Sequence, residues 1–211
     1  LFAAGKGNEI NVMSYNIRMD TQNDGENAWP HRKDLAGKML RFHEVDIFGA
    51  QEVLHHQLTD MLERLPGYDY VGVGRTDGKT KGEYAPIIYR KDRFSVEKHG
   101  DFWLAEDMNA VGKKGWDAAC ERVATWAILK DKQSGKRFFF FNTHLDHIGK
   151  VARHEGAKLV LAQCTKLSEG LPVIVTGDFN ATPDDDPIQV LTNASDPNHL
   201  THSRNLATLK Y

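Results

Sequence analysis

Residues 172–180 read PVIVTGDFN, a short apolar run that leads into two polar side chains, Asp178 and Asn180. The β-branched run predicts a buried strand, and Gly177 marks the point at which its backbone turns. Asp178 and Asn180 are two residues apart, so an extended backbone places both side chains on one face. A carboxylate there can accept a proton from water or bind a metal ion, and a carboxamide can donate to a phosphate oxygen. Such a pair also occurs in ordinary capping just past a strand, so its interpretation depends on the rest of the chain.

Three other apolar segments end in comparable polar side chains. These side chains are Asn16 after residues 12–15, Glu52 after residues 46–51, and His144 and Asp146 after the phenylalanine run at 138–141. Each residue has a plain structural interpretation on its own, as a turn residue, a helix-start carboxylate or an interior histidine. Four such strand ends in one chain indicate a shared site, because functional residues gather where rigid strands meet loops.

The same residues resemble a known family. The matching motifs, which span residues 10–191, are Ser14-Tyr15-Asn16, Gln51-Glu52, Asn142-Thr143-His144 and Gly177-Asp178-Phe179-Asn180. Their order and spacing are similar to those of the endonuclease/exonuclease/phosphatase superfamily. That superfamily includes DNase I-like nucleases, deadenylase-type RNA exonucleases, neutral sphingomyelinases and inositol-polyphosphate 5-phosphatases. The motifs are specific for the superfamily and hardly at all for one substrate.

The order of predicted elements indicates an α/β fold with two sheets. Strands alternate with helices early in the chain, and residues 125–130 and 137–143 form a hairpin across Gln133-Ser134-Gly135. The helix that follows Pro30 is predicted to bury Leu35, Met39 and Phe42. The resemblance implies a DNase I-like, four-layer α/β/β/α sandwich of two mixed sheets with the site at one edge. Residues 1–9 are expected to be an N-terminal tail and residues 10–211 a single domain.

The composition is that of a globular protein with little overall charge. The 211 residues are 40% hydrophobic, and 27 Lys and Arg against 29 Asp and Glu give a net charge of −2. This balance argues against a protein that coats nucleic acid, but not against an enzyme that binds one or two phosphates. No apolar run approaches the roughly 18 residues of a membrane helix, and a monomer is expected. The chain begins at Leu1 rather than at a methionine. Removal of a signal peptide, which would imply a secreted or periplasmic location, and trimming of the expressed protein both explain this start.

The two cysteines, Cys120 and Cys164, are too few for a disulfide scaffold. Cys164 lies on the apolar stripe of the helix predicted over residues 150–168 and is expected in the core. A bridge between the two cysteines remains an alternative to two free thiols.

The resemblance implies a role for each candidate residue around a divalent cation. Glu52 would be the principal Mg²⁺ ligand, with Asn16 contributing and Mn²⁺ as a substitute. Asp178 would orient or deprotonate the attacking water, and Asn180 would hold a phosphoryl oxygen. His144, with a pKa expected near neutrality, would stabilise the oxyanion or act as an acid. Asp146 would either position His144 or its neighbour His147, or be a solvated turn carboxylate.

Substrate contacts are expected from Arg122, Arg153 and Trp116. Guanidinium groups suit phosphate, although a surface salt bridge is the ordinary role of an arginine. Trp116 lies in the irregular segment 101–122, where substrate choice is expected to be made, and its alternative role is buried packing.

These residues support three hypotheses about function. The first is a Mg²⁺-dependent nuclease or phosphodiesterase of the exonuclease or deadenylase-like branch, with nucleic acid as its partner. The second keeps the chemistry but acts as an inositol-phosphate phosphatase or a sphingomyelinase-type phosphodiesterase. The third, from another class, is a non-catalytic binding module that retains the pocket.

One departure from the superfamily concerns its C-terminal Asp-His pair, which supplies a carboxylate and a second catalytic histidine. After Asn180 the chain has no such pair, and Asp146-His147 belongs by position to the preceding motif. The expectation is therefore an incomplete domain that lacks its C-terminal strands. Such a domain would leave a sheet edge uncovered and be catalytically weak.

Overall fold

The structure is a computed structural model that describes residues 9–208. The expected tail at residues 1–9 lies outside the described residues apart from Glu9. The strands are β1 (Val12–Asn16), β2 (Ile47–Gln51), β3 (Tyr68–Val71), β4 (Ile87–Arg90), β5 (Phe94–Trp103), β6 (Val123–Asp131), β7 (Arg137–His144) and β8 (Val173–Asp178). The helices are the 3₁₀ helix η1 (Gln22–Asn27), α1 (Trp29–Phe42), α2 (His55–Arg64), α3 (Lys150–Leu167), α4 (Asp186–Thr192) and α5 (Ser203–Leu206). None of the helices within residues 9–208 has the length and apolar character needed to cross a membrane.

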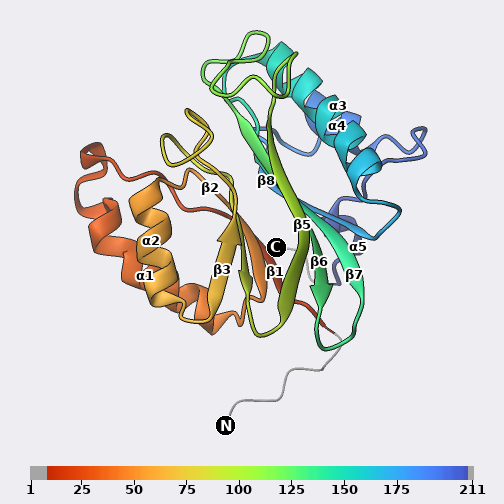
Figure 1. Ribbon diagram of the computed structural model, residues 1–211. Helices are drawn as coiled ribbons and strands as arrows, with labels where there is room; N and C mark the ends of the chain where they lie inside the picture. Colours follow the sequence, from red (N-terminus) through yellow and green to blue (C-terminus); the bar gives the residue numbers. More distant parts are fainter. Residues whose placement is uncertain (1–8, 209–211) are drawn as a thin grey trace.

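The strands form two mixed sheets of four strands each, in the orders β1-β2-β4-β3 and β5-β6-β7-β8. The pairs β1–β2 and β7–β8 are parallel, and the remaining neighbours are antiparallel. The two sheets face each other, with α1 and α2 outside the first and α3 and α4 outside the second (Figure 1). This arrangement is the four-layer α/β/β/α sandwich that the sequence and its resemblance predicted.

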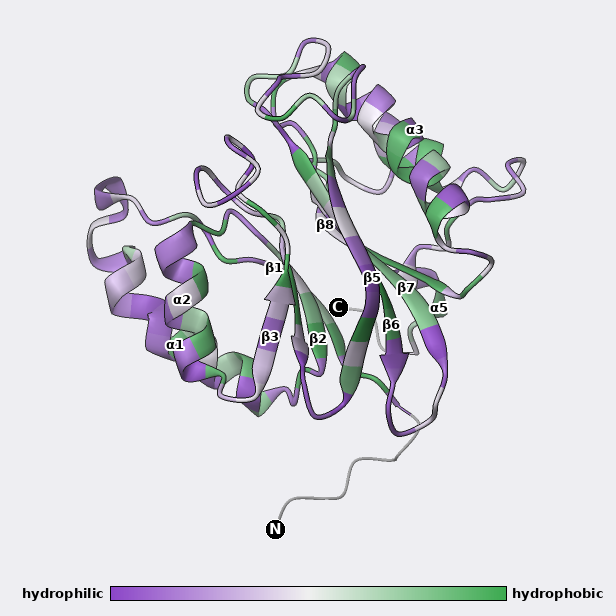
Figure 2. Ribbon diagram, in the orientation of Figure 1, coloured by the Kyte–Doolittle hydropathy of each residue, from purple (hydrophilic) through white to green (hydrophobic). Residues whose placement is uncertain are grey.

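The phenylalanine run in β7 supplies side chains to two separate cores. Successive side chains of a strand point to opposite faces, so alternate phenylalanines enter different layers. Phe139 and Phe141 pack among residues of α3, whereas Phe138 and Phe140 pack between the two sheets with residues such as Ile47. Figure 2 shows the resulting hydrophobic positions along β2 and β7 and on parts of α3. A continuous apolar run is therefore buried on both of its faces, as expected for an interior strand.

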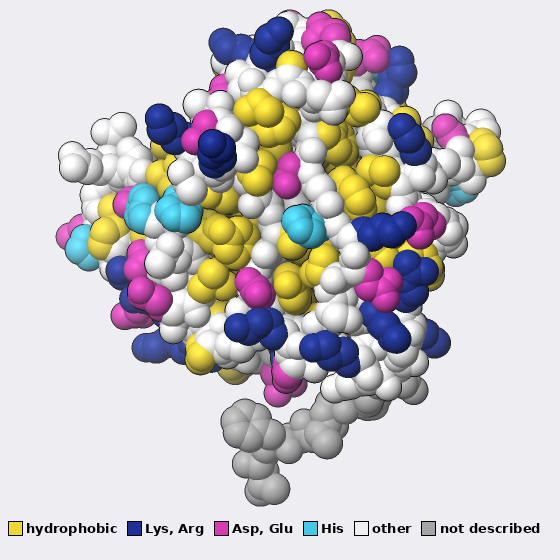
Figure 3. Space-filling model, viewed as in Figure 1, with side chains coloured by type: hydrophobic (Ala, Val, Ile, Leu, Met, Phe, Trp, Pro, Cys, Tyr) yellow, Lys and Arg dark blue, Asp and Glu magenta, His cyan; other side chains and the backbone are white. Residues whose placement is uncertain are grey.

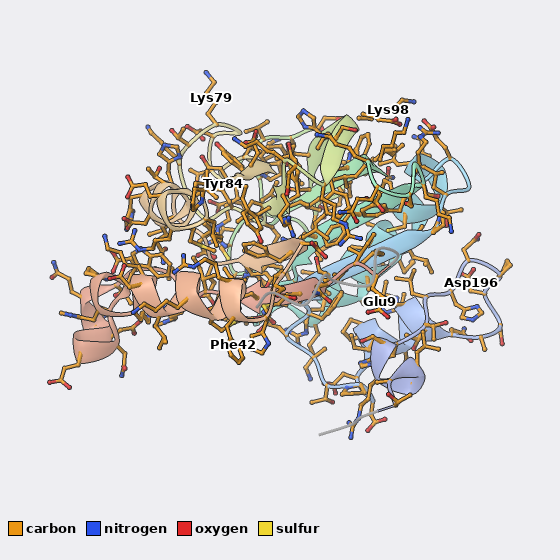
Figure 4. The ribbon with its side chains drawn as sticks, turned by 90° about the horizontal axis from the view of Figure 1, so that it is seen from below. Glu9, Phe42, Lys79, Tyr84, Lys98 and Asp196 are labelled. Carbon is orange, nitrogen blue, oxygen red and sulfur yellow. The ribbon has the colours of Figure 1, made fainter. Side chains whose placement is uncertain are left out.

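The prediction for the buried face of α1 was wrong for Leu35 and Phe42, whereas Met39 is partly buried and packs against the core. Leu35 and Phe42 are 67% and 82% exposed, and Figure 4 shows Phe42 on the outer side of the helix. The buried positions are instead Trp29, Ala36, Gly37 and Leu40. A Cβ at Gly37 would lie 2.9 Å from the Cβ of Arg64 in α2, so small residues on this face allow the close approach of the two helices.

Both cysteines are free thiols, and the alternative of a bridge between them was wrong. Cys164 is 2% exposed in the core beneath α3, and burial raises its pKa to about 12. It behaves as a small apolar side chain.

Candidate active site

The polar ends of β1, β2, β7 and β8 meet at one edge of the sandwich. Parallel pairing brings together the ends of β1 and β2, and likewise those of β7 and β8. Ser14 joins the two pairs, because its Oγ accepts a hydrogen bond from Gly177 N at 3.1 Å and donates to Gly177 O at 3.2 Å. The four strand ends identified from the sequence are therefore neighbours in space.

Two residues of the motifs hold the sheets together beneath this edge. Asn142 is fully buried and donates to Ala50 O at 2.7 Å and to Pro86 O at 2.9 Å in the facing sheet. Gln51 donates to Asn142 Oδ1 at 2.7 Å. Gly49 lies against this network, since a Cβ there would be 2.3 Å from Asn142 Oδ1. These buried amides set the spacing of the sheets on which the site is built.

Asn16 joins the two carboxylates of the site. Its Nδ2 donates to Glu52 Oε1 at 2.7 Å and to Asp178 Oδ2 at 2.9 Å. Glu52, Asp178 and His144 each offer a ligand atom, and these atoms lie within 4.8 Å of one another. Carboxylate oxygens are the donors that Mg²⁺ prefers, and it needs only one or two of them from the protein. A divalent cation would also offset the repulsion between the two carboxylates, so the residues present fit such an ion.

Three residues around this cluster have left-handed backbone conformations that are uncommon outside glycine. Arg18, Glu52 and Asn180 have φ values of 61°, 60° and 47°, and they follow β1, β2 and β8. Such conformations persist only where the surroundings hold them, and they concentrate at functional sites.

The loop after β1 is held by two residues that sequence reasoning missed. Arg32 donates to Arg18 O and to Asn27 O, both at 2.7 Å. Gln57, fully buried in α2, donates to Arg18 O and accepts from Asp20 N, both at 3.0 Å. Between these anchors, Met19 N donates to Glu52 Oε2 at 3.0 Å. No local pattern marks either residue, because their partners are backbone groups distant in the sequence.

His144 lies between two carboxylates. Its Nε2 is 3.9 Å from Asp178 Oδ2, and its Nδ1 is 3.9 Å from Glu83 Oε2. Burial and the charge of Arg122 lower the pKa of His144 to about 4. The expectation of a pKa near neutrality was therefore wrong, since a buried imidazole beside a guanidinium resists protonation. At neutral pH His144 is an uncharged hydrogen-bond donor and acceptor. Glu83, which sequence reasoning missed, pairs with Arg75 at 2.7 Å.

Asp178 is an ionised carboxylate at neutral pH. Burial alone would raise its pKa, but hydrogen bonds from Asn16 and from Asn180 N hold the pKa below its ordinary value. Asn180 N donates to Asp178 Oδ1 at 3.0 Å, and Asn180 Nδ2 donates to Leu145 O at 2.9 Å. Since an amide nitrogen carries two hydrogens, Asn180 keeps one for a further acceptor.

Asp146 is buried, so its interpretation as a solvated turn carboxylate was wrong. It is 2% exposed and accepts from the backbone nitrogens of Ala119, Ile148 and Gly149 at 2.7–3.1 Å. Although burial opposes the shift, these amides and the charge of Arg122 hold the pKa of Asp146 well below its usual range. The carboxylate fixes the loop between β7 and α3 and accepts from Arg122 Nε at 3.3 Å.

Arg122 is 4% exposed and is not the surface arginine that its alternative interpretation implied. Its Nη2 contacts His147 Nδ1 at 2.9 Å, so Asp146 and His147 together orient the guanidinium. Arg153 donates to Asp146 O at 3.0 Å and therefore joins the same loop. Trp116 is half-buried in the segment between β5 and β6, with a left-handed φ of 50°.

Comparisons with known proteins agree with this fold. A model of the Endonuclease/Exonuclease/phosphatase family matches residues 13–207. A solved endonuclease/exonuclease/phosphatase from Bacteroides vulgatus is 47% identical, with a TM-score of 0.85 over 87% of this chain and 70% of that one. A mannosyl-6-phosphatase from Bacteroides thetaiotaomicron VPI-5482 is 46% identical, with a TM-score of 0.84 over 86% of this chain and 69% of that one.

A curated relative of another kind is the CCR4-Not complex 3'-5'-exoribonuclease subunit Ccr4 of Mycosarcoma maydis. It is 26% identical over 89% of this chain and 36% of its own length. The chain thus spans about a third of the length of this relative.

Proposed function

The chain belongs to the endonuclease/exonuclease/phosphatase family, and we propose that it is a Mg²⁺-dependent phosphatase that removes a terminal phosphate from a sugar. Phosphoester hydrolysis is the chemistry of the family. The observation that carries the proposal is the joining of Glu52 and Asp178 through Asn16, with uncharged His144 beside them.

The choice of a sugar phosphate rests on the similarity to the mannosyl-6-phosphatase. A sugar phosphate was not among the substrates of the sequence-based hypotheses, and this choice departs from the nuclease that came first among them. The surface charge supports the same choice. The net charge is −2, and the face in Figure 3 carries basic and acidic side chains interspersed rather than a basic track. A polynucleotide is usually bound by a continuous basic surface, whereas one phosphate group needs only a few donors.

The mechanism follows from what each side chain can donate or accept. A divalent cation held by Glu52, whose carboxylate Asn16 Nδ2 orients, would neutralise charge on the phosphoryl oxygens. Asp178 accepts a proton from the attacking water through its ionised carboxylate. The free amide hydrogen of Asn180 and an N–H of His144 donate to phosphoryl oxygens, which spread charge in the transition state. Asp146 positions Arg122, whose guanidinium adds positive charge beside His144.

The test is hydrolysis of a substrate panel by the full chain with Mg²⁺, with Mn²⁺ and with a chelator. The panel holds mannose 6-phosphate, single-stranded RNA and a bis-phosphoester. We expect metal-dependent release of inorganic phosphate from mannose 6-phosphate, abolished in Asp178→Asn. The control is Asp117→Asn, an exposed carboxylate that accepts from Ala152 N at the start of α3.

A second candidate is a 3'-5' exoribonuclease, which the similarity to Ccr4 favours. Turnover of RNA with mannose 6-phosphate untouched would select it and overturn the phosphatase proposal. If the folded protein binds Mn²⁺ and hydrolyses nothing in the panel, the result favours the hypothesis of a binding module that retains the pocket.

A further inference from the structure

Arg18 places an exposed guanidinium group beside Glu52. Its Nη1 lies 3.8 Å from Glu52 Oε2, and its side chain is 55% exposed. Arg122, in contrast, is 4% exposed and is already bonded to Asp146. Arg18 is therefore an arginine that a substrate arriving from solvent can reach directly.

The backbone of Arg18 fixes the direction in which this side chain leaves the loop after β1. Its φ of 61° is left-handed, a conformation that is unfavourable for a residue with a Cβ. Three hydrogen bonds hold it there: Arg18 N donates to Asn16 Oδ1 at 2.9 Å, and Arg18 O accepts from Arg32 at 2.7 Å and from Gln57 at 3.0 Å. Strained positions that are held so firmly are concentrated at ligand sites.

One edge of the guanidinium group is occupied and the other is free. Asp24, in η1, accepts from Arg18 Nε at 3.1 Å and from Nη2 at 3.0 Å. A guanidinium group has five N–H donors, so two remain on Nη1 and one on Nη2. These three have no hydrogen-bond partner among residues 9–208, because Glu52 at 3.8 Å is beyond hydrogen-bond distance. The free edge is a planar pair of donors of the kind that binds two phosphate oxygens.

We propose that the free edge of Arg18 binds terminal oxygens of a phosphate monoester and thereby makes the site select phosphomonoesters over phosphodiesters. This inference rests on the proposed function and names the substrate class within it. Glu52 marks the place of the cation that phosphoryl oxygens would contact, and the free edge of Arg18 lies beside that place.

The number and charge of the phosphoryl oxygens explain the selection. A monoester has three terminal oxygens and about −1.5 to −2 charge at pH 7, whereas a diester has two such oxygens and a single charge. The cation on Glu52, Asn180 and His144 can all be satisfied by two terminal oxygens. The third oxygen, which only a monoester has, gives Arg18 its partner. In a diester that oxygen carries a second substituent and no charge, so a guanidinium beside it gains little.

The ordinary alternative is an ion pair in which Arg18 and Asp24 only attach η1 to the loop. Such a pair requires neither the left-handed backbone nor the free edge beside Glu52. The two accounts predict different results for the two partners. In an ion pair, loss of either residue has the same effect. In the proposal Asp24 is a positioning residue, so Asp24→Asn should lower phosphate affinity less than Arg18→Met.

The direct test is calorimetric titration of the full chain with inorganic phosphate and with dimethyl phosphate, at pH 7 and saturating Mg²⁺. Arg18→Met should weaken the binding of inorganic phosphate about tenfold or more and that of dimethyl phosphate less than about twofold. Arg18→Lys guards against a folding defect, since it retains the charge but not the planar edge, and it should still lose part of the affinity for phosphate. The control is Arg137→Met, because Arg137 pairs with Glu97 at 2.6 Å at the opposite end of β7 from His144.

The proposal is overturned if the wild type binds no inorganic phosphate, if Arg18→Met weakens both ligands equally or neither, or if Arg18→Lys has wild-type affinity. Turnover gives a second measurement with p-nitrophenyl phosphate and bis(p-nitrophenyl) phosphate, which share a leaving group. The ratio of their kcat/KM values should fall about tenfold in Arg18→Met, and an unchanged ratio would also refute the selection. Failure of the proposed function would appear separately, as untouched mannose 6-phosphate in the wild type, and the phosphate titration would still test Arg18.

Discussion

Replacing Asp146 by Asn should destabilise the protein strongly. The buried carboxylate only accepts hydrogen bonds, whereas the amide that replaces it would turn an NH₂ donor toward the N–H donors around it. Both carboxylate oxygens accept: Oδ1 from the amides of Ile148 and Gly149, and Oδ2 from Ala119 N and Arg122 Nε. In either orientation the new NH₂ group would face two of these donors. The substitution also leaves the guanidinium of Arg122, 4% exposed, without its counter-charge. Breaking a buried pair in this way costs about 3–5 kcal/mol.

In urea denaturation at pH 7 the loss should appear as a lower free energy of unfolding. In thermal denaturation it should appear as a Tm about 10 °C lower. The control is Asp117→Asn, whose exposed carboxylate caps α3 without a buried arginine and should cost about 1 kcal/mol or less. A loss below about 1 kcal/mol in Asp146→Asn would refute the account of a buried, fully used carboxylate.

The pH dependence of stability gives an independent check on Asp146. Its pKa in the folded protein lies well below its usual range, so the carboxylate binds a proton more readily in the unfolded chain. The stabilisation is therefore complete above the unfolded pKa of about 3.9 and is lost as pH falls below it. Unfolding free energy should fall more steeply between about pH 5 and 2 in the wild type than in Asp146→Asn. Parallel curves for the two proteins would contradict the assignment.

Three further substitutions test the metal site and its support. Glu52→Gln should weaken Mn²⁺ binding, measured by calorimetry. The loss of affinity should exceed the roughly 10–100-fold that is typical when a residue supporting a metal ligand is changed. Unchanged affinity would show that Glu52 is not the ligand. Gln57→Leu should weaken the same binding about tenfold by freeing the loop that carries Met19 N, whereas Gln189→Leu, which loses an exposed bond to Pro183 O, should not. Gly49→Ala should lower the free energy of unfolding in urea by about 2–4 kcal/mol, because its Cβ would lie 2.0 Å from Thr176 Oγ1, and a near-neutral effect would show that the sheets can separate.

The sequence by itself determined the strands and the residues at their ends. Apolar runs, glycines and the polar side chains that follow them are local features, and the hairpin of β6 and β7 was predicted from such features alone. Asn16, Glu52, His144 and Asp178 converge because parallel strands bring their carboxyl ends to one edge, a consequence of topology that the motifs already implied.

The tertiary structure decided which faces are buried and what the buried groups contact. Leu35 and Phe42 have helical spacing, yet they do not lie on the buried face of α1. The buried face is the one on which Gly37, having no side chain, lets Arg64 of α2 approach closely. The low pKa of His144 depends on its burial and on Arg122, 22 residues earlier in the chain, which no local pattern reveals. Glu83 and Gln57 reach the site only through packing between distant segments. The burial and the pKa of a side chain depend on its neighbours in space. They could therefore be determined only from the tertiary structure, in which the two sheets lie face to face.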